Sequence, residues 1–296
     1  MNTTRSEARQ LFRGLTFLSP WLVGFLVFTL IPIALSLRYS FSRYSLLQPP
    51  LFKGLENYGT LLRDDVFWKV LKNTLIYAAV ALPVGMLVAL TVAILLNAKI
   101  RGVTIYRTIV FLPSLVPVVA SAMLWMWLFN ARLGLINSFL RAIGVVDPPG
   151  WLTDAHWAMS ALILMSFWGI GNTVVIYLAG LQDVPRELYE AAEIDGASPL
   201  RKVWHVTLPS ISPVIFFNLI MGIIGTLQIL AAPMIMTGGG PARSTYFFTM
   251  YLYDNAFLYL KMGYASALAW VLLLIVLALT ALAAISGKRW VHYSGK

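Results

Sequence analysis

The chain has 296 residues, of which 59% are hydrophobic and only 11% are charged, and its formal net charge is +10. Soluble domains carry roughly 25% charged residues, so this composition favours a membrane protein. The absence of cysteine excludes disulfide frameworks and cysteine-based catalysis, and the three scattered histidines do not have the spacing of a metal site.

Six apolar segments are each long enough to cross a bilayer as a helix, which takes about 18 residues or more. They are residues 15–37, 74–97, 108–130, 157–181, 211–236 and 263–286. None contains Asp, Glu, Lys, Arg or His. In lipid, such segments must satisfy their backbone groups internally, which favours helices over strands. We therefore predict an all-α integral membrane protein with six transmembrane helices.

Basic residues predict the orientation of these helices, because Lys and Arg in short segments favour the cytoplasmic side. They gather before the first segment, between the second and third, and after the sixth: Arg5, Arg9, Arg13, Lys99, Arg101, Arg107, Lys288 and Arg289. Both termini are therefore expected in the cytoplasm, with the first segment retained as a span and not cleaved as a signal peptide. Loops 38–73, 131–156 and 237–262 are then expected outside.

The expected organisation has three parts. Residues 1–69 contain the N-terminal tail, the first span and an outer loop, in which a hinge is predicted at 47–57 around Pro49 and Pro50. Residues 70–286 form a five-helix unit, and residues 287–296 form a cytoplasmic tail.

The cytoplasmic loop 182–212 is rich in helix signals. Pro185 suits a first helical position, residues 186–195 are good helix formers, and Gly196 can end that helix in a left-handed conformation. Ser198 can cap a second short helix over 199–206, which Pro209 interrupts. The pattern predicts a helix–glycine turn–helix elbow at the membrane surface, with one apolar face on each helix: Leu188, Ala191 and Ala192 on the first, Leu200, Val203 and Trp204 on the second.

One stretch of this loop resembles the EAA loop of bacterial ABC-importer permeases. It reads Glu190-Ala191-Ala192-Glu193-Ile194-Asp195-Gly196-Ala197 and continues to Thr207-Leu208-Pro209. Further stretches resemble the carbohydrate (maltose and glycerol-phosphate type) branch of that family: residues 54–58, 73–74, 237–241 and 263–265. The resemblance implies a MetI-like core of five helices preceded by an N-terminal span, located in the bacterial cytoplasmic (inner) membrane.

The resemblance also implies a mechanism. Glu190, Ala191, Ala192, Asp195 and Gly196 would couple this chain to a separate ATPase. The chain itself would hold no cofactor, since ATP and Mg would be bound by that ATPase, and it would not be an enzyme. Its implied partners are a second homologous permease, a cytoplasmic ATPase dimer, an extracytoplasmic solute-binding protein, a sugar substrate and membrane lipid, with no nucleic acid. The alternative for the loop is an ordinary amphipathic surface helix.

The energy source has to lie outside this chain. A phosphate-binding GxxxxGK[ST] sequence is absent. The spans also lack the ionisable groups that ion-coupled carriers usually keep there, although an ion-coupled secondary transporter stays open as the alternative. An intramembrane enzyme would need paired carboxylates or a histidine cluster within a span, and neither is present.

A path free of charge suits a neutral polyhydroxylated solute, which binds amides, hydroxyls and aromatic faces. Candidates lie in the fourth and fifth spans: Trp168, Gly169, Asn172, Asn218, Gly222, Thr226 and Gln228. Trp168 and Asn172 are expected on one helical face. Asn218 could instead bond a neighbouring helix, and Gly222 with Thr226 could form a helix-packing face.

Overall fold

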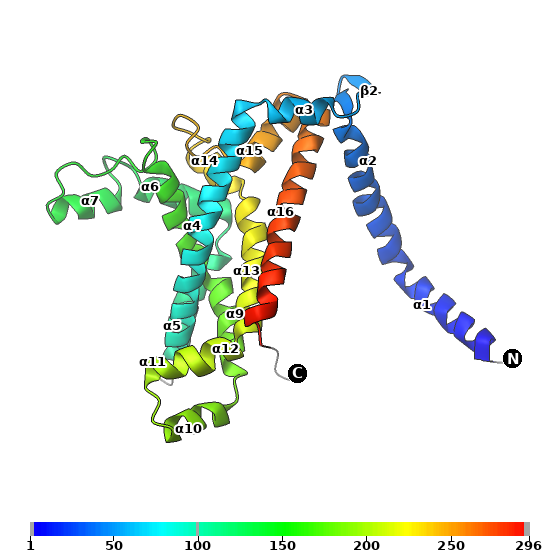
Figure 1. Cartoon of the computed structure of the whole chain (residues 1–296). Helices are drawn as coiled ribbons and strands as arrows, with labels where there is room; N and C mark the ends of the chain where they lie inside the picture. The colour runs from blue at the N-terminus through cyan, green and yellow to red at the C-terminus, as the bar shows by residue number, and fades with distance from the viewer. Residues whose placement is uncertain (1–2, 99–100, 293–296) are drawn as a thin grey trace. The chain divides into compact units, whose positions relative to one another are not determined.

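The computed structural model describes residues 3–98 and 101–292 (Figure 1). Four helical stretches are long and apolar enough to cross a membrane: Gly14–Ser40, Asp65–Leu96, Ser212–Met236 and Met262–Trp290. Two bent helix pairs also qualify, Val103–Leu115 with Val118–Leu128 at 100° and Ala158–Gly169 with Gly171–Gln182 at 47°. If each pair is one crossing, the described residues contain the six predicted spans, and the all-α membrane fold is confirmed.

Proline explains the sharper bend. Helix α5 (Val103–Phe111) passes into η2 (Leu112–Leu115) and then stops, because Val116 is extended before Pro117, with φ −75° and ψ 128°. A residue before proline is pushed out of the helical region by the proline ring. Helix α6 (Val118–Leu128) restarts after Pro117 in a new direction.

The chain forms two compact units. The first contains the chain up to Asp64 together with Leu252–Val271. Its elements are α1 (Thr3–Phe25), η1 (Leu26–Leu30), α2 (Ile31–Ser40), β1 (Ser42–Ser45), β2 (Gln48–Phe52), α3 (Glu56–Leu62), η5 (Asp254–Leu258) and the first part of α16 (Met262–Trp290).

The predicted hinge at 47–57 is instead part of a folded hairpin. Strands β1 and β2 pair antiparallel, with Ser42 opposite Phe52 and Ser45 opposite Gln48. Pro49 and Pro50 lie in β2, which is an edge strand and therefore tolerates residues that donate no backbone hydrogen bond.

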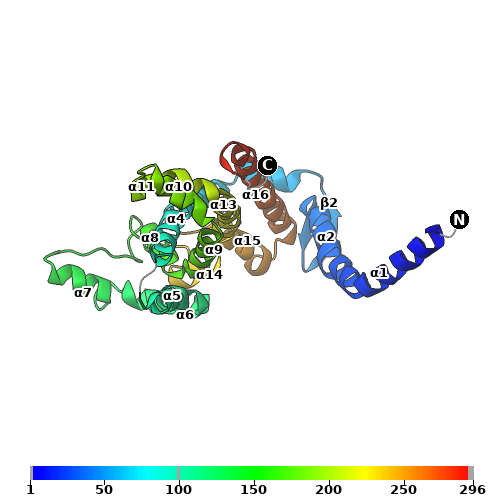
Figure 2. The ribbon, with the colours of Figure 1, turned by 90° about the horizontal axis from the view of Figure 1, so that it is seen from below.

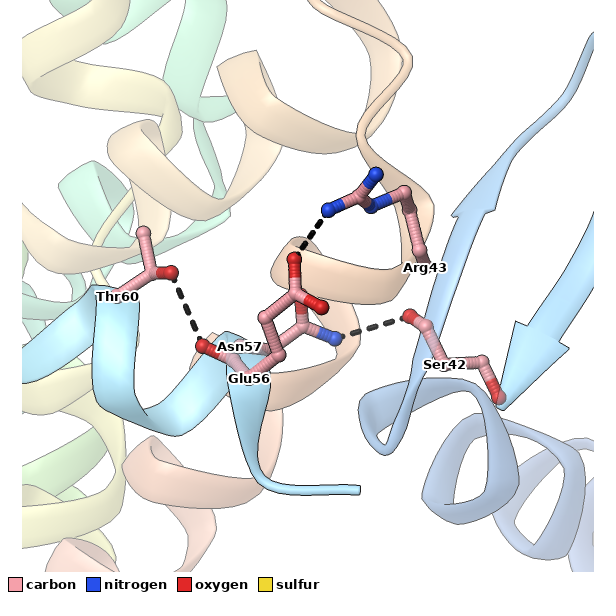
Figure 3. A network of polar contacts seen from close by, with 5 residues as sticks. All are labelled: Ser42, Arg43, Glu56, Asn57 and Thr60. Atoms are coloured by element: carbon pink, nitrogen blue, oxygen red, sulfur yellow. Dashed lines mark hydrogen bonds and ion pairs between the residues drawn. The ribbon is translucent and has the colours of Figure 1, made fainter. Parts of the chain in front are cut away.

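A polar network holds this hairpin against α3 (Figure 3). The Asn57 amide donates to the carbonyl oxygens of Ser40 and Ser42 at 2.8 and 2.9 Å, and Arg43 forms an ion pair with Glu56. Gly263 at the start of α16 completes the packing, since a Cβ there would overlap the Ser42 carbonyl oxygen. Two separate stretches of the sequence motif, 54–58 and 263–265, therefore fold around one hairpin.

The second unit comprises Asp65–Tyr251 and the chain from Leu272. Its further elements are α4 (Asp65–Leu96), α7 (Leu135–Ala142), α8 (Ala158–Ser166), η3 (Phe167–Gly169), α9 (Gly171–Gln182), α10 (Arg186–Ile194), α11 (Pro199–Lys202), η4 (Val203–Thr207), α12 (Leu208–Ser210), α13 (Ser212–Leu227), α14 (Ala231–Met236) and α15 (Phe248–Tyr253), the last of which runs into the first unit.

Helix α4 organises the second unit by packing along α9 and α13. It begins at Asp65, ahead of the predicted apolar start at residue 74, because its polar first turns are also helical. Small side chains at Ala89 and Ala93 are fully buried and let α9 approach, where Tyr177 fills the core. This packing places α9 and α13, the helices that flank loop 182–212, beside α4 (Figure 2).

Candidate functional site

Helix α10 contains most of the EAA-type motif. It begins at Arg186, and Pro185 immediately before it is extended, with φ −58° and ψ 134°. Pro185 is therefore the capping residue that precedes the helix, and the prediction that it occupies the first helical position is wrong by one residue. Glu187 lies in the first turn, where the helix dipole favours a carboxylate.

The helix ends in a Schellman turn built around Gly196. Gly196 has φ +72°, as predicted. Its N–H donates to the Glu193 carbonyl at 3.0 Å, and the Ala197 N–H donates to the Ala192 carbonyl at 2.9 Å. These are the two bonds that satisfy the last helical carbonyls in this motif. The chain reverses here in a defined geometry.

The second helix of the elbow is longer than predicted. Ser198 caps it through its Oγ, which accepts from the Arg201 N–H at 3.4 Å, as expected for Ser198. The helix does not stop at Val206, nor does Pro209 interrupt it. In the π-turn η4, the Leu208 N–H donates to the Val203 carbonyl. Helix α12 then continues through Pro209 to Ser210. Widening the turn relieves the clash that a proline ring makes with the preceding turn.

Two side-chain contacts join the arms of the elbow. The Lys202 ammonium pairs with the Glu193 carboxylate at 2.6 Å, and the Tyr189 and Thr207 hydroxyls lie 3.0 Å apart. Lys202 is the more buried partner of the ion pair, and Thr207 is buried. The two arms are thereby held at a fixed separation.

The elbow encloses a shallow groove of about 530 Å³. Three of the predicted coupling residues, Ala191, Ala192 and Asp195, line it, while Glu190 and Gly196 do not. Glu190 is exposed, and its carboxylate has no ion-pair partner among the described residues. Large apolar side chains also project from the elbow, with Ile194 88% and Trp204 63% exposed. A charged group beside bare apolar side chains is a surface suited to another protein.

Two cavities of the second unit are lined by residues predicted for the solute path. The first, of about 360 Å³, is lined by Trp168 and Gly169 from the predicted set. The second, of about 370 Å³, is lined by Asn172, Asn218, Gly222 and Thr226. Gln228 lines neither; it is exposed where α13 ends, with φ −107° and ψ 17°.

The expectation that Trp168 and Asn172 share a helical face is wrong. Trp168 lies in the 3-10 turn η3, and Asn172 lies in α9 beyond a 47° bend. Gly171 lies just after the bend and lets α9 approach α5 closely, because a Cβ there would come within 2.8 Å of the Val110 carbonyl oxygen. The two side chains therefore line different cavities.

The fifth-span candidates bond largely to their own helix. The Asn218 amide donates to the Val214 carbonyl at 3.1 Å, and the Thr226 hydroxyl donates to the Gly222 carbonyl at 2.7 Å. A Cβ on Gly222 would overlap Leu82 of α4. Gly222 is thus a close-packing position. Asn172, in contrast, is exposed, and its amide has no hydrogen-bond partner among the described residues.

Sequence reasoning missed Tyr77 and Ser166, which line both cavities. Tyr77 is almost fully buried on α4, and its hydroxyl interacts with that of Ser166. The pair therefore stands between the two cavities. In the sequence, Tyr77 and Ser166 each appear as a single hydroxyl within an apolar span. Such residues are common in packed helices and do not indicate a particular site.

A polar clamp fixes the loop between α14 and α15. The Asn73 amide donates to the carbonyl oxygens of Arg243 and Tyr246 at 2.8 and 3.0 Å, and the Thr74 hydroxyl accepts from the Phe248 N–H at 2.9 Å. Arg243 has a left-handed backbone, with φ +55°. Residues 73–74 thus hold residues 243–248, and the Thr245 hydroxyl links that stretch to 237–241 by donating to the Gly240 carbonyl at 2.7 Å.

The apolar helical spans, the neutral linings of the two cavities and the two-helix elbow are features of a membrane transport subunit. The chain belongs to the family of binding-protein-dependent transport system inner membrane components, which matches residues 65–292. It is a permease subunit of an ATP-binding-cassette importer, a transport component and not an enzyme, and the EAA-type loop is consistent with this family. Membership decides against the ion-coupled carrier.

Relatives extend this assignment to the full chain. The chain is 38% identical over 300 residues to the probable ABC transporter permease protein YesP of Bacillus subtilis (strain 168), covering 100% of this chain and 97% of YesP. It is 36% identical to the lactose transport system permease protein LacF of Rhizobium radiobacter, covering 94% and 95%. A solved bacterial ABC transporter involved in the import of the acidic polysaccharide alginate matches 98% of this chain and 99% of its own, with 24% identity and a TM-score of 0.85, which shows the fold.

Proposed function

We propose that this chain forms half of the path for a sugar or related polar solute and receives the energy of ATP hydrolysis through loop 182–212. The observation that supports the coupling role is the structure of the elbow. Its Schellman turn at Gly196 and its Glu193–Lys202 ion pair make it rigid, so a push on α10 is transmitted to α12 and α13. Glu190 is presented beside exposed apolar side chains, with no ion-pair partner among the described residues.

Each of the five coupling residues has its own role. Glu190 would pair with a basic group of the ATPase, Ala191 and Ala192 would allow close approach, and Asp195 with Gly196 would shape the turn. An ATPase dimer in the cytoplasm, a second homologous permease and an extracytoplasmic solute-binding protein would complete the transporter. Both termini and the elbow would then lie in the cytoplasm.

The two cavities support a neutral, hydroxyl-rich solute. Their polar lining consists of hydroxyls and amides with the Trp168 indole, and no charged side chain of the described residues lines either cavity. Aromatic faces and neutral donors suit sugars. A lactose permease among the relatives agrees with this class. We assign Asn172 as the main polar contact, because its amide makes no hydrogen bond among the described residues and can bond the solute. The further candidates for the path are Trp168, Gly169, Asn218, Gly222, Thr226 and Gln228.

The coupling is tested by reversing one charge. In vesicles holding the complete transporter, Glu190→Lys should abolish both uptake and the ATP hydrolysis that accompanies it, while the protein still inserts. Glu187→Lys, the same change one turn earlier on α10, is the matched control and should retain most uptake. Normal coupled uptake by Glu190→Lys would overturn the assignment.

The substrate class is tested by identifying the solute that co-purifies with the cognate binding protein. With that solute, Asn172→Ala should raise the concentration needed for half-maximal uptake, since a hydroxyl of the solute loses its hydrogen-bond partner. Asn97→Ala, at the far end of α4 and away from both cavities, should have no effect. A charged solute without hydroxyl groups would contradict the proposed class.

A further inference from the structure

Helix α7 (Leu135–Ala142) displays an apolar face that no described residue covers. Leu135, Phe139 and Ile143 follow one another at intervals of four and are all exposed, Phe139 at 65%. Flanking Leu133 and Val146 are 79% and 95% exposed. The adjacent side of the helix packs on a buried cluster of the second unit through two partly buried residues, Ile136 and Leu140. Soluble surfaces rarely leave so many large apolar side chains bare.

The loop that carries α7 is rigidly built. The fully buried Asn137 donates to the carbonyl oxygens of Ala131 and Pro149 at 3.0 and 2.9 Å and accepts from the Trp151 indole N–H at 2.7 Å. These three bonds orient the helix, so the apolar face is presented in a fixed direction. The exposure of this face therefore does not result from a loosely held loop that could bury the same side chains by closing.

The direction of α7 indicates what covers this face. Its eight residues span only about 12 Å, too short to cross a bilayer. Within the second unit, α7 lies across the long axis of α4 (Figure 1), and the view from below agrees (Figure 2). Because α4 is a candidate membrane span, a helix that lies across it runs parallel to the bilayer plane.

The charges around α7 favour lipid over a second protein. Arg132 and Arg141 are exposed, residues 131–146 contain no Asp or Glu, and the exposed Asp147 follows directly after them. A one-sided apolar helix with arginines at its edge matches the bilayer interface, where apolar side chains enter the acyl region and guanidinium groups meet anionic headgroups.

We propose that residues 133–146 form an interfacial membrane anchor, with Leu135, Phe139 and Ile143 in the acyl region and Arg132 and Arg141 at anionic headgroups. The anchor is independent of which solute the transporter carries. It would fix the depth of the segment between α6 and α8, whose Trp151 is bonded to Asn137 of the anchor.

The test uses nitroxide labels on single cysteines, which the cysteine-free chain accepts without background. In the assembled transporter in phosphatidylethanolamine–phosphatidylglycerol vesicles, a label at Phe139→Cys should collide severalfold more often with oxygen than with a water-soluble nickel chelate. Ser138→Cys, exposed on the polar side with Arg141, is the matched control and should show the reverse preference.

Two results would overturn the proposal. Rare collisions with both reagents at Phe139→Cys would show that a protein partner covers the face, and frequent collisions with the nickel chelate would place it in water. A second variant tests the headgroup contact. Adding Arg132→Glu to the Phe139→Cys variant should make the label shallower in phosphatidylglycerol vesicles and leave its depth unchanged in pure phosphatidylcholine. An equal depth of the label in both kinds of vesicle would exclude the headgroup contact.

Discussion

The glycines of the spans differ in what surrounds them, and this separates packing positions from open ones. Gly171 at the start of α9 meets backbone atoms of α5: a methyl group added there would lie 2.8 Å from the Val110 oxygen and 3.0 Å from the Phe111 Cα. Gly225 on α13 has nothing within 4 Å. Backbone atoms cannot move aside as a side-chain end can, so the same methyl group has opposite consequences at the two sites.

We therefore expect Gly171→Ala to destabilise the protein by about 1–3 kcal/mol, the usual effect of overpacking a tight contact. Gly225→Ala is the control and should be neutral or stabilising by up to about 1 kcal/mol, because alanine favours the helix. Thermal unfolding of both variants in the same detergent measures the difference. Equal melting temperatures would show that α9 does not approach α5 this closely.

A second residue-scale prediction concerns pH. The hydrogen bond from Arg43 lowers the pKa of the Glu56 carboxyl from its ordinary value of 4.5, assisted by the positive charges of Arg43 and Lys53. A carboxyl with a lowered folded-state pKa stabilises the fold above its unfolded pKa and loses that contribution as the pH falls through the folded value.

The melting temperature of the wild type should therefore exceed that of Glu56→Gln at neutral pH, and the gap should close on acidification below 4.5. Arg43→Gln should show the same pH dependence, since it removes the other half of the pair. Asp65→Asn, outside this network, is the control. A gap that stays constant across the acid range would mean that the ion pair does not form.

At the scale of elements, the clamp between α4 and the outer loop makes the sharpest prediction. Asn73→Ala removes both donors to the carbonyl groups of Arg243 and Tyr246, which remain in place without these bonds. The expected cost is about 1–3 kcal/mol of unfolding free energy. Asn97→Ala at the other end of α4 is the control, because its amide makes no side-chain hydrogen bond among the described residues. A melting temperature equal to that of the control would contradict the clamp.

How much of the structure can be predicted from the sequence differs from element to element. Apolar length alone predicted the four continuous spans and the location of the two bent pairs. Local chemistry predicted the left-handed Gly196 and the Ser198 cap, because each rests on one residue's own conformational preference. The bends were missed because hydropathy does not register a break such as that at Pro117 inside an apolar run. The pairing of Asn73 with Arg243, or of Asn57 with Ser42, joins stretches that a single sequence leaves unrelated.

At the scale of the whole molecule, the family match at residues 65–292 begins with α4, where the second compact unit also begins. The first unit combines the N-terminal span with the hairpin and the start of α16. Residues 1–69, 70–286 and 287–296 remain the proposed functional division, with the coupling loop 182–212 in the middle part.

The bent pairs leave one whole-molecule question, whether each crosses the membrane or turns back as a re-entrant loop. The proposed orientation of the termini and the elbow holds if both pairs cross or if both turn back, whereas the 131–156 loop lies outside only if both cross. Single cysteines at four exposed positions decide it: Thr104, Asp147, Ile194 and Ala242. None of the four is a glycine or a helix-capping side chain. Ala242 has a left-handed backbone with φ +49°, but it already carries a Cβ, so a cysteine there adds no new backbone constraint.

An impermeant maleimide should label Thr104→Cys and Ile194→Cys only in inside-out vesicles, and Asp147→Cys and Ala242→Cys only in right-side-out vesicles. The reason is geometric: α5 with α6 separates the first and second positions along the chain, α8 with α9 the second and third, and α13 with α14 the third and fourth. The cysteine-free parent is the control for background. Labelling of Asp147→Cys from the same side as Thr104→Cys and Ile194→Cys would show two re-entrant loops and four crossings, and the proposed location of the 131–156 loop would fall with the six-span topology.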